Sequence, residues 1–171
     1  KIVADKKSAR MLLPNMLTLI GVCIGLTSIR FALDGRFELA IIAIIFAALI
    51  DGLDGRIARL IKGTSKVGKE LDSLTDMISF GVAPAFIMYF WKLNTLGRFG
   101  WLLCLVFVIS VALRLARFNI NSNQESSWRD NFFEGVPSPA GGILVLTPLI
   151  FSMTSFDLFQ INYDLVVPIF F

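Results

Sequence analysis

Residues 51–76 read DGLDGRIARLIKGTSKVGKELDSLTD and join two apolar segments through a polar connection. Successive residues of an α-helix are rotated by about 100°, so positions three or four apart share a face. In the first segment that face holds two carboxylates and two very small residues: Asp51, Asp54, Gly55 and Ala58, with Arg59 at its margin. In the second segment the shared face holds Gly68, Asp72, Asp76, Ser79 and Ala83. The short connection predicts antiparallel neighbouring helices whose acidic faces converge.

The four aspartates of this stretch predict a metal site. Carboxylate oxygens are hard ligands that suit Mg²⁺, Mn²⁺ or Ca²⁺ better than softer metals. Four carboxylates held together without a cation would repel one another. The alternative is a solvated loop in which the aspartates pair with nearby cations: Arg56, Arg59, Lys66 and Lys69. That alternative accounts for the charges but leaves the small residues between them unexplained.

The composition is that of an integral membrane protein. Hydrophobic residues make up 56% of the 171-residue chain, and the mean hydropathy is +0.74. Only 17% of the residues are charged, against about 25% in soluble domains. The apolar residues also come in long blocks. We therefore expect one all-α membrane domain over residues 1–171, a bundle of about six transmembrane helices.

The expected spans follow the apolar blocks. They cover residues 15–33, 37–61, 69–91, 99–119 and 135–156, and a sixth begins near Tyr163 and is cut off by the end of the sequence. Asp34-Gly35 predicts a turn, and residues 120–134 predict a polar loop. Gly81 and Pro84 should bend the third span or widen a cavity beside it.

The first residues of the chain form a basic, partly amphipathic lead-in. Residues 1–14 combine Lys and Arg with Ile, Val, Met and Leu, which favours an interfacial helix on an anionic membrane surface. A disordered basic tail is the alternative. Pro14 is expected near the start of the first span. Asn15 and Thr18, at the mouth of that span, either cap the helix or form hydrogen bonds to a ligand.

Positive charge is divided unequally between the two ends of the expected bundle. With six alternating spans, twelve of the 16 Lys and Arg residues fall at the end that carries the aspartates. The other four are Arg30, Arg36, Lys92 and Arg98. Because basic residues favour the cytoplasmic side of a membrane, we expect the acidic site to open to the cytoplasm.

The residues also predict a reaction type. Charged side chains in membrane spans are costly and normally mark a functional site. A pair of divalent cations held by the aspartates could grip a pyrophosphate and neutralise its leaving phosphate. Arg59 could bind phosphate, and the small residues beside it would leave room for a nucleotide. The chain has no histidine, so Asp76, nearest the membrane interior, is the expected general base. The prediction is metal-assisted phosphoryl transfer at a membrane surface.

The motif also resembles a known family. The pattern Asp51-x-x-Asp54-Gly55-x-x-Ala58-Arg59, eight residues, Gly68-x-x-x-Asp72-x-x-x-Asp76 is similar at every defined position to the signature of the CDP-alcohol phosphatidyltransferases. Members of this family transfer a phosphatidyl group from a CDP-linked lipid to an alcohol and release CMP. The resemblance implies that the first three aspartates bind metal and that the fourth, Asp76, is the base beside them. It implies a CDP site from Asp54 to Gly68. Asn15 and Thr18 of the first span join this set. The expected nucleotide-binding residues are therefore Asn15, Thr18, Asp54, Gly55, Ala58, Arg59, Gly68 and Asp72.

Other parts of the chain predict the acceptor alcohol. The runs SFGVAPAF, RLARFN and FEGVPSPAGG, which begin at Ser79, Arg114 and Phe133, resemble the phosphatidylserine synthase branch of the family. Arg114 and Arg117 could bind the serine carboxylate, since a guanidinium recognises carboxylates through two hydrogen bonds. Lys66 is a further expected acceptor- or phosphate-binding residue. Glycerol-phosphate or inositol-phosphate would also attract arginine, and both arginines could instead snorkel to anionic headgroups.

The cofactors and partners follow from this interpretation. We expect two divalent-cation sites for Mg²⁺ or Mn²⁺, with Ca²⁺ as a bound substitute. The expected partners are CDP-diacylglycerol, L-serine, membrane lipids and a second copy of the chain in a homodimer, and no nucleic acid.

Two other classes of function use the same residues. An ion transporter would bind its cation through aspartates in membrane helices, but it would need them near mid-bilayer, whereas here they gather towards one face. A non-catalytic membrane protein that binds metal or a nucleotide-lipid would need the same pocket without turnover. The presence of Asp76 argues against that reading.

Overall fold

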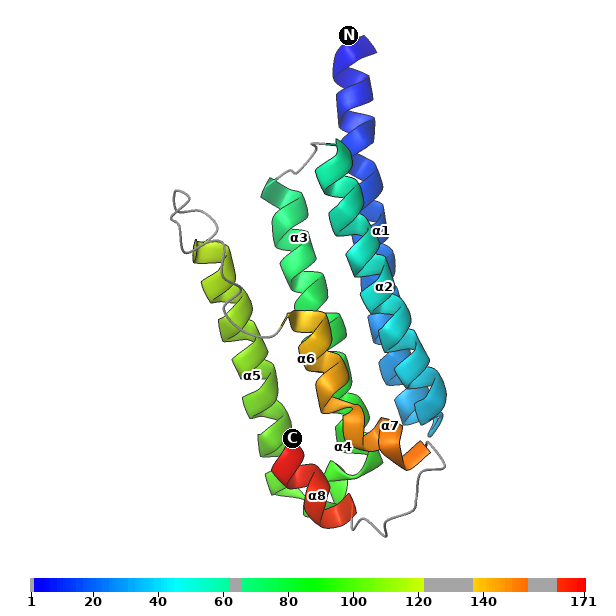
Figure 1. The fold of residues 1–171 in the computed structure, drawn as a ribbon, viewed down its shortest axis with the longest axis vertical. Helices are drawn as coiled ribbons and strands as arrows, with labels where there is room; N and C mark the ends of the chain where they lie inside the picture. The colour runs from blue at the N-terminus through cyan, green and yellow to red at the C-terminus, as the bar shows by residue number, and fades with distance from the viewer. Residues whose placement is uncertain (1, 62–65, 122–136, 154–162) are drawn as a thin grey trace.

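The computed structural model describes residues 2–61, 66–121, 137–153 and 163–171, and all regular elements in these ranges are helices (Figure 1). Side chains are described for fewer residues, and those of 2–14, 58, 59, 61 and 66 are among the ones left out. The α-helices are α1 (Ile2–Leu33), α2 (Phe37–Ile61), α3 (Lys66–Asp76), α4 (Ala83–Trp91), α5 (Arg98–Asn121), α6 (Ser138–Val145), α7 (Thr147–Met153) and α8 (Tyr163–Phe170). The all-α prediction is confirmed for this part of the chain.

The two longest helices form an antiparallel pair. α2 has the bounds predicted for the second span, and the turn before it lies at the predicted Asp34-Gly35, where Gly35 has φ +74°. A positive φ strains residues that carry a Cβ, so glycine suits this turn. α2 buries small and branched side chains, including Ala40, Ile44 and Ala47. α3 runs antiparallel to α2, as predicted from their short connection (Figure 1).

Three helical segments of the described chain are long and apolar enough to cross a membrane: Asn15–Leu33, Val67–Trp91 and Arg98–Ile120. They match the first, third and fourth predicted spans. α2 is not among them, because every 18-residue stretch of it contains Asp51 and Asp54 together with Glu38 or Arg56. The structure therefore supports a membrane protein, while the count of six spans stays a prediction.

The first helix differs from its prediction. α1 begins at Ile2 and continues through Pro14 without a break, so the expected start of a helix at Pro14 is wrong. Proline removes one backbone hydrogen bond. The strong helix formers on either side of it keep the chain helical: Met11, Leu12, Leu13, Met16 and Leu17. The lead-in is thus the first part of α1, and its placement at a membrane interface stays a prediction.

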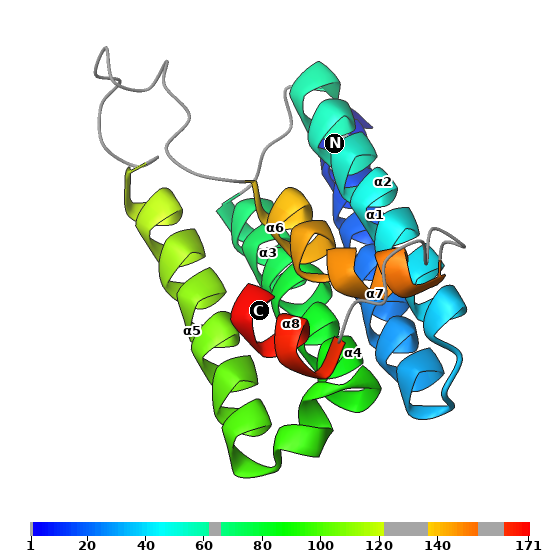
Figure 2. The same cartoon turned by 60° about the horizontal axis from the view of Figure 1, so that its bottom comes forward.

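The fifth predicted span is also divided. Residues 138–153 form two short helices, α6 and α7, which meet at Leu146 and point in different directions (Figures 1 and 2). Pro148, the second residue of α7, cannot donate the backbone hydrogen bond that would continue α6. The predicted polar loop at 120–134 lies outside the described residues except for its first two positions, which extend α5. The sixth predicted helix is α8.

A π-helical segment, Met77–Val82, joins α3 to α4 within the third predicted span. Here the N–H of Ala83 donates to the carbonyl of Ile78, five residues earlier. Pro84 has no N–H for the carbonyl of Phe80 in an α-helical pattern, so a wider turn at this point is physically expected. The helix thus departs from α-helical geometry at the predicted place, while the bend or wider cavity expected from Gly81 and Pro84 stays a prediction. α6 packs closely on this turn, because a Cβ at Gly142 would lie 3.0 Å from the Phe80 carbonyl oxygen.

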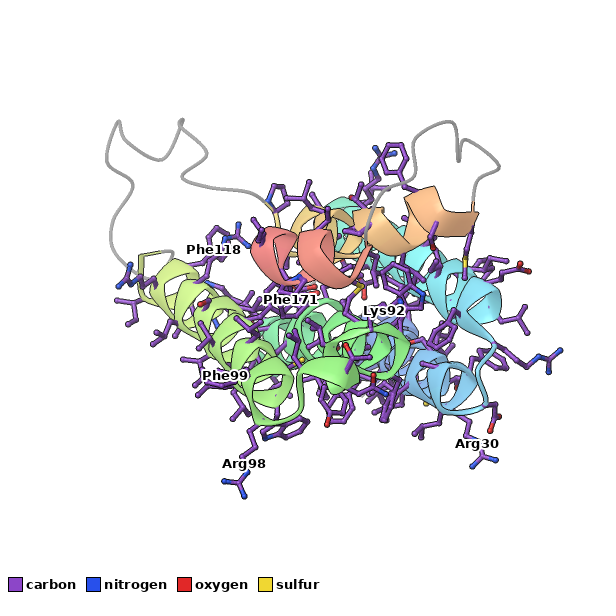
Figure 3. All side chains as sticks on the ribbon, turned by 90° about the horizontal axis from the view of Figure 1, so that it is seen from below. Arg30, Lys92, Arg98, Phe99, Phe118 and Phe171 are labelled. Atoms are coloured by element: carbon purple, nitrogen blue, oxygen red, sulfur yellow. The ribbon has the colours of Figure 1, made fainter. Side chains whose placement is uncertain are left out.

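Basic residues occupy both ends of the bundle. At the lower end of Figure 1 lie the last turn of α1 with Arg30, the turn before α2 with Arg36, and the connection from α4 to α5 with Lys92 and Arg98. Figure 3 views this end and shows Arg30 and Arg98 projecting outward. The opposite end receives the last turns of α2 and α5 and the start of α3. The aspartates lie towards that opposite end, as predicted.

Candidate metal and substrate site

Small residues let α1 approach the helix that carries the third and fourth aspartates. A Cβ at Gly25 would lie 2.5 Å from the Ser79 hydroxyl, and one at Gly21 would lie 3.5 Å from the methyl group of Thr75. The Ser79 hydroxyl donates to the carbonyl of Gly21 at 3.4 Å. Thr75 and Ser79 are buried. This close packing places the middle of α1 directly beside the helical span that carries Asp72 and Asp76.

Three aspartates converge where those faces meet. One carboxylate oxygen from each of Asp51, Asp54 and Asp72 lies within 4.8 Å of the other two. Their exposure increases from the interior outward: Asp54 is 3% exposed, Asp51 is half-buried and Asp72 is exposed. The cluster is therefore anchored inside the bundle on α2 and open to solvent on the α3 side.

A buried hydroxyl orients the deepest of these carboxylates. Thr18 of α1 donates a hydrogen bond to Oδ2 of Asp54 at 2.7 Å. Thr18 lies in the middle of α1, so the alternative that it caps the helix is wrong. Asn15 precedes it by three residues on the same helix and is half-buried. The sequence placed these residues at the site but did not predict the bond to Asp54.

Asp76 completes the predicted set of four and has a different environment. Its carboxyl lies close enough to the Asp51 carboxyl and to the Ser138 hydroxyl for their side chains to interact. Its Oδ1 is buried and has no hydrogen-bond partner among the described residues. A buried oxygen without a donor is costly, so a cation or a hydroxyl group bound here would relieve that cost. Asp76 therefore has an oxygen available for a ligand.

The donor set fits a divalent cation. Hard cations bind carboxylate oxygens at about 2.0–2.6 Å, so ligand oxygens on one cation are at most about 5 Å apart. The 4.8 Å limit for Asp51, Asp54 and Asp72 meets that requirement. Without a cation the three charges would repel one another in a partly buried place, and the free Oδ1 of Asp76 offers one more ligand atom.

The predicted nucleotide residues are described only in part. Apart from its chain neighbours and its own helix backbone, a Cβ at Gly55 would meet no atom of the described residues within 4 Å, so the space beside this glycine is open in that part of the chain. Gly68 is half-buried in the first turn of α3. The side chains of Ala58, Arg59 and Lys66 lie outside the described residues. Their expected contacts with a nucleotide or phosphate thus stay predictions.

The two arginines of α5 differ in their surroundings. Arg114 is half-buried, and its Nη1 donates to the hydroxyl of Ser138 at 3.2 Å. Arg117, one turn later, is exposed. Arg114 is thereby connected through Ser138 to Asp76, whereas Arg117 faces outward at the same end of the bundle.

Two polar residues of the site region were missed from the sequence. Ser138 lies between two prolines in the run FEGVPSPAGG. These prolines, which restrict the backbone, are the only feature of the local sequence that could have pointed to it. Asn119 ends the quoted run RLARFN, and its side-chain amide donates to the hydroxyl of Ser73 at 2.9 Å. That bond ties the end of α5 to α3, one residue after Asp72.

Comparisons with known proteins agree with the motif. The model of the CDP-alcohol phosphatidyltransferase family matches residues 11–169. A CDP-diacylglycerol–serine O-phosphatidyltransferase from Mycobacterium leprae (strain TN) is 44% identical over 137 residues, which cover 79% of this chain and 45% of that protein. The protein of the same name from Helicobacter pylori (strain ATCC 700392 / 26695) is 44% identical over 135 residues, or 79% of this chain and 56% of the relative.

A shorter relative of the same name, from Bacillus subtilis (strain 168), is 34% identical over 134 residues, which cover 78% of this chain and 73% of the relative. The chain spans about half the length of the first mycobacterial relatives. The family match nevertheless includes all four aspartates, the π-helical segment and the arginines of α5. This chain belongs to the CDP-alcohol phosphatidyltransferase family.

Proposed function

We propose that this chain transfers the phosphatidyl group of CDP-diacylglycerol to the hydroxyl of L-serine, giving phosphatidylserine and CMP. One observation carries the proposal: the aspartate cluster lies beside a buried carboxylate oxygen that lacks a donor, and the same carboxylate is linked through Ser138 to an arginine. The names of the relatives supply the donor and the acceptor.

The first part of the proposal concerns the metal. Asp51, Asp54 and Asp72 would hold divalent cations, with Asp76 as a fourth carboxylate at the edge of the set. When bound, Mg²⁺ or Mn²⁺ in two sites, or Ca²⁺ as a substitute, would neutralise the pyrophosphate and stabilise the leaving CMP. The bond from Thr18 holds the Asp54 carboxylate in one orientation before any ligand arrives.

The nucleotide of the donor lies, in this proposal, along the open side of α2. The open space beside Gly55 among the described residues supports room for the nucleotide there. Asn15, Thr18, Asp54, Gly55, Ala58, Arg59, Gly68 and Asp72 form the proposed nucleotide site. The acyl chains of the donor would stay in the hydrocarbon, because the apolar spans continue directly from the site.

Asp76 is the proposed base. Its Oδ1 is buried but without a donor among the described residues, which suits an oxygen that receives a hydrogen bond and then a proton from an attacking hydroxyl. The hydroxyl oxygen would attack the phosphorus on the lipid side of the pyrophosphate. The bond from that phosphorus to the CMP oxygen breaks, and the proton moves to Asp76.

The acceptor side of the site is proposed to lie on α5. Arg114 and Arg117 would bind the carboxylate of serine, and Lys66 would bind acceptor or phosphate. Phosphate groups suit arginine equally well, so glycerol-phosphate or inositol-phosphate is the second candidate acceptor with the same chemistry.

The proposal includes an orientation in the membrane. Arg56, Lys69, Arg114 and Arg117 belong to the end of the bundle near the aspartates. By the positive-inside rule that end would face the cytoplasm. Six spans, an interfacial first part of α1 and a homodimer complete the proposed arrangement.

A turnover assay with the full chain tests this function. The purified protein, in lipid–detergent micelles with CDP-diacylglycerol and Mn²⁺ or Mg²⁺, would receive serine, ethanolamine, glycerol-phosphate or inositol-phosphate in separate reactions. We expect CMP release with serine, little with ethanolamine, and none after chelation of the metal. Equal use of ethanolamine, or preferred use of a phosphorylated acceptor, would overturn the serine assignment and leave the family standing.

A further inference from the structure

Ser138 lies between Asp76 and Arg114. The proposed function makes Asp76 the base and Arg114 a residue that binds the acceptor. Ser138 is the half-buried first residue of α6. Its hydroxyl oxygen accepts a hydrogen bond from Nη1 of Arg114 on α5 at 3.2 Å. The same hydroxyl lies close enough to the carboxyl of Asp76, at the end of α3, to interact with it. One hydroxyl thus joins three helices that are far apart in the sequence.

The chemistry of these groups fixes the direction of the bond from Arg114 and of the interaction with Asp76. A guanidinium can only donate, so the Ser138 oxygen accepts from Arg114. A serine hydroxyl has a single proton, which leaves that proton for the carboxylate of Asp76. The chain of donors therefore runs from Arg114 through Ser138 to Asp76, and Oδ1 of Asp76 remains without a described partner.

The backbone around Ser138 holds the hydroxyl in place. Pro137 and Pro139 flank it, and each restricts the local backbone. Pro137 has φ −55° and ψ 147°, which is the extended entry to α6. Farther along α6, Gly142 lies against the backbone of Phe80 in the π-helical segment. α6 is thereby fixed against the same helix that carries Asp76.

We infer that Ser138 is a positioning residue, which holds the Asp76 carboxylate and the Arg114 guanidinium in a fixed relation. An acceptor bound by Arg114 through its carboxylate would then present its hydroxyl to the free oxygen of Asp76. Ser138 itself touches no reacting atom. This inference rests on the proposed function and adds to it the residue that couples acceptor binding to proton removal.

Three substitutions of Ser138 test the inference. Ser138→Ala removes the hydroxyl, and Ser138→Cys keeps nearly the same volume but offers a weak donor and acceptor. Both should lower kcat with serine by about tenfold to a hundredfold, the loss expected for a hydrogen bond to a charged group. Ser138→Thr keeps a hydroxyl and should stay within about threefold of the unsubstituted protein, because its hydrogen bonds remain possible.

Two other measurements separate positioning from general damage. Binding of CDP-diacylglycerol, measured without turnover, and the thermal midpoint in detergent should change little in the Cys variant. In an Arg114→Lys background, Ser138→Ala should cost less than it does alone, since coupled residues are not additive. Ser110→Ala is the matched control, because this exposed serine of α5 bonds only within its own helix, to the Val106 carbonyl.

The measurements on the Ser138 variants can contradict the positioning role in two ways. Unchanged kcat in both the Ala and Cys variants, or an equal loss in Ser138→Thr, would overturn the positioning role. Additive losses with Arg114→Lys would overturn the coupling. If the unsubstituted chain used another acceptor in place of serine, the proposed function would fail separately, and the same pattern of Ala, Cys and Thr with that acceptor would still decide the role of Ser138.

Discussion

The two sides of the site are built differently. On the side of α1, α2 and α3, small residues bring the helices together, and Thr18 bonds the buried Asp54 at 2.7 Å. On the side of α5 and α6, α5 stands apart from α3 at its last turns (Figures 1 and 2). There it is connected by side-chain bonds such as Arg114 to Ser138 and Asn119 to Ser73.

Because the two sides are built differently, we expect them to have different roles in the reaction. In the proposed function, metal and nucleotide binding would depend on a close-packed framework, in which each carboxylate has little freedom. Acceptor choice would depend on an exposed arginine, a half-buried arginine and a few long polar contacts, which can change without repacking the core. Substitutions on the first side should therefore reduce catalysis with any acceptor, whereas substitutions on the second side should mainly change the response to serine.

The largest effect is expected at the junction of the two sides. Asp76→Asn keeps the shape of the side chain but removes the proposed base, so kcat should fall by about 10²- to 10⁴-fold. Binding of CDP-diacylglycerol, measured without turnover, should be largely intact. If donor binding were lost as completely as in Asp54→Asn, Asp76 would be better described as another metal ligand.

The next effect tests the close-packed side. Asp51→Asn, Asp54→Asn or Asp72→Asn should each lower activity by about 10²- to 10³-fold, because each removes a charged metal ligand. The metal concentration that gives half-maximal activity should rise in the same variants. Asp34→Asn is the control, since Asp34 is exposed at the opposite end and pairs with Arg30. Full turnover in all three variants would contradict a metal site here.

A smaller and more selective effect is expected on the α5 side. Arg114→Lys keeps the charge but loses the planar fork that binds a carboxylate. The KM for serine should rise by about tenfold, while the KM for CDP-diacylglycerol changes much less. Arg98→Lys, at the opposite end of the same helix, should leave both values unchanged. A parallel rise in both KM values would place Arg114 at the donor instead.

The smallest effect concerns the orientation of a metal ligand. Thr18→Val is nearly isosteric and removes the hydroxyl that bonds Asp54. The apparent affinity for the divalent cation should fall by about two- to tenfold, the value of one ordinary hydrogen bond. Thr27→Val serves as the control, because Thr27 is exposed and bonds within α1 to the Cys23 carbonyl. An unchanged metal response would show that Asp54 needs no such support.

Local patterns allowed much of the fold and the site to be predicted. Helical periodicity alone placed the four aspartates on converging faces, because residues three and four apart must share a face. The bounds of α2 and the turn at Gly35 were predicted correctly for the same reason, since an apolar block and a turn residue act locally. The distortion near Pro84 likewise follows from a missing N–H within one segment.

What the sequence by itself determined was therefore the membrane character, the helical elements and the acidic site. Only the tertiary structure decided which distant groups meet: Thr18 with Asp54, Asn119 with Ser73, and Ser138 with both Arg114 and Asp76. It also divided the fifth predicted span into α6 and α7 and carried α1 through Pro14. The physical reason is that periodicity fixes the face on which a side chain lies, whereas helix packing decides which other face it meets.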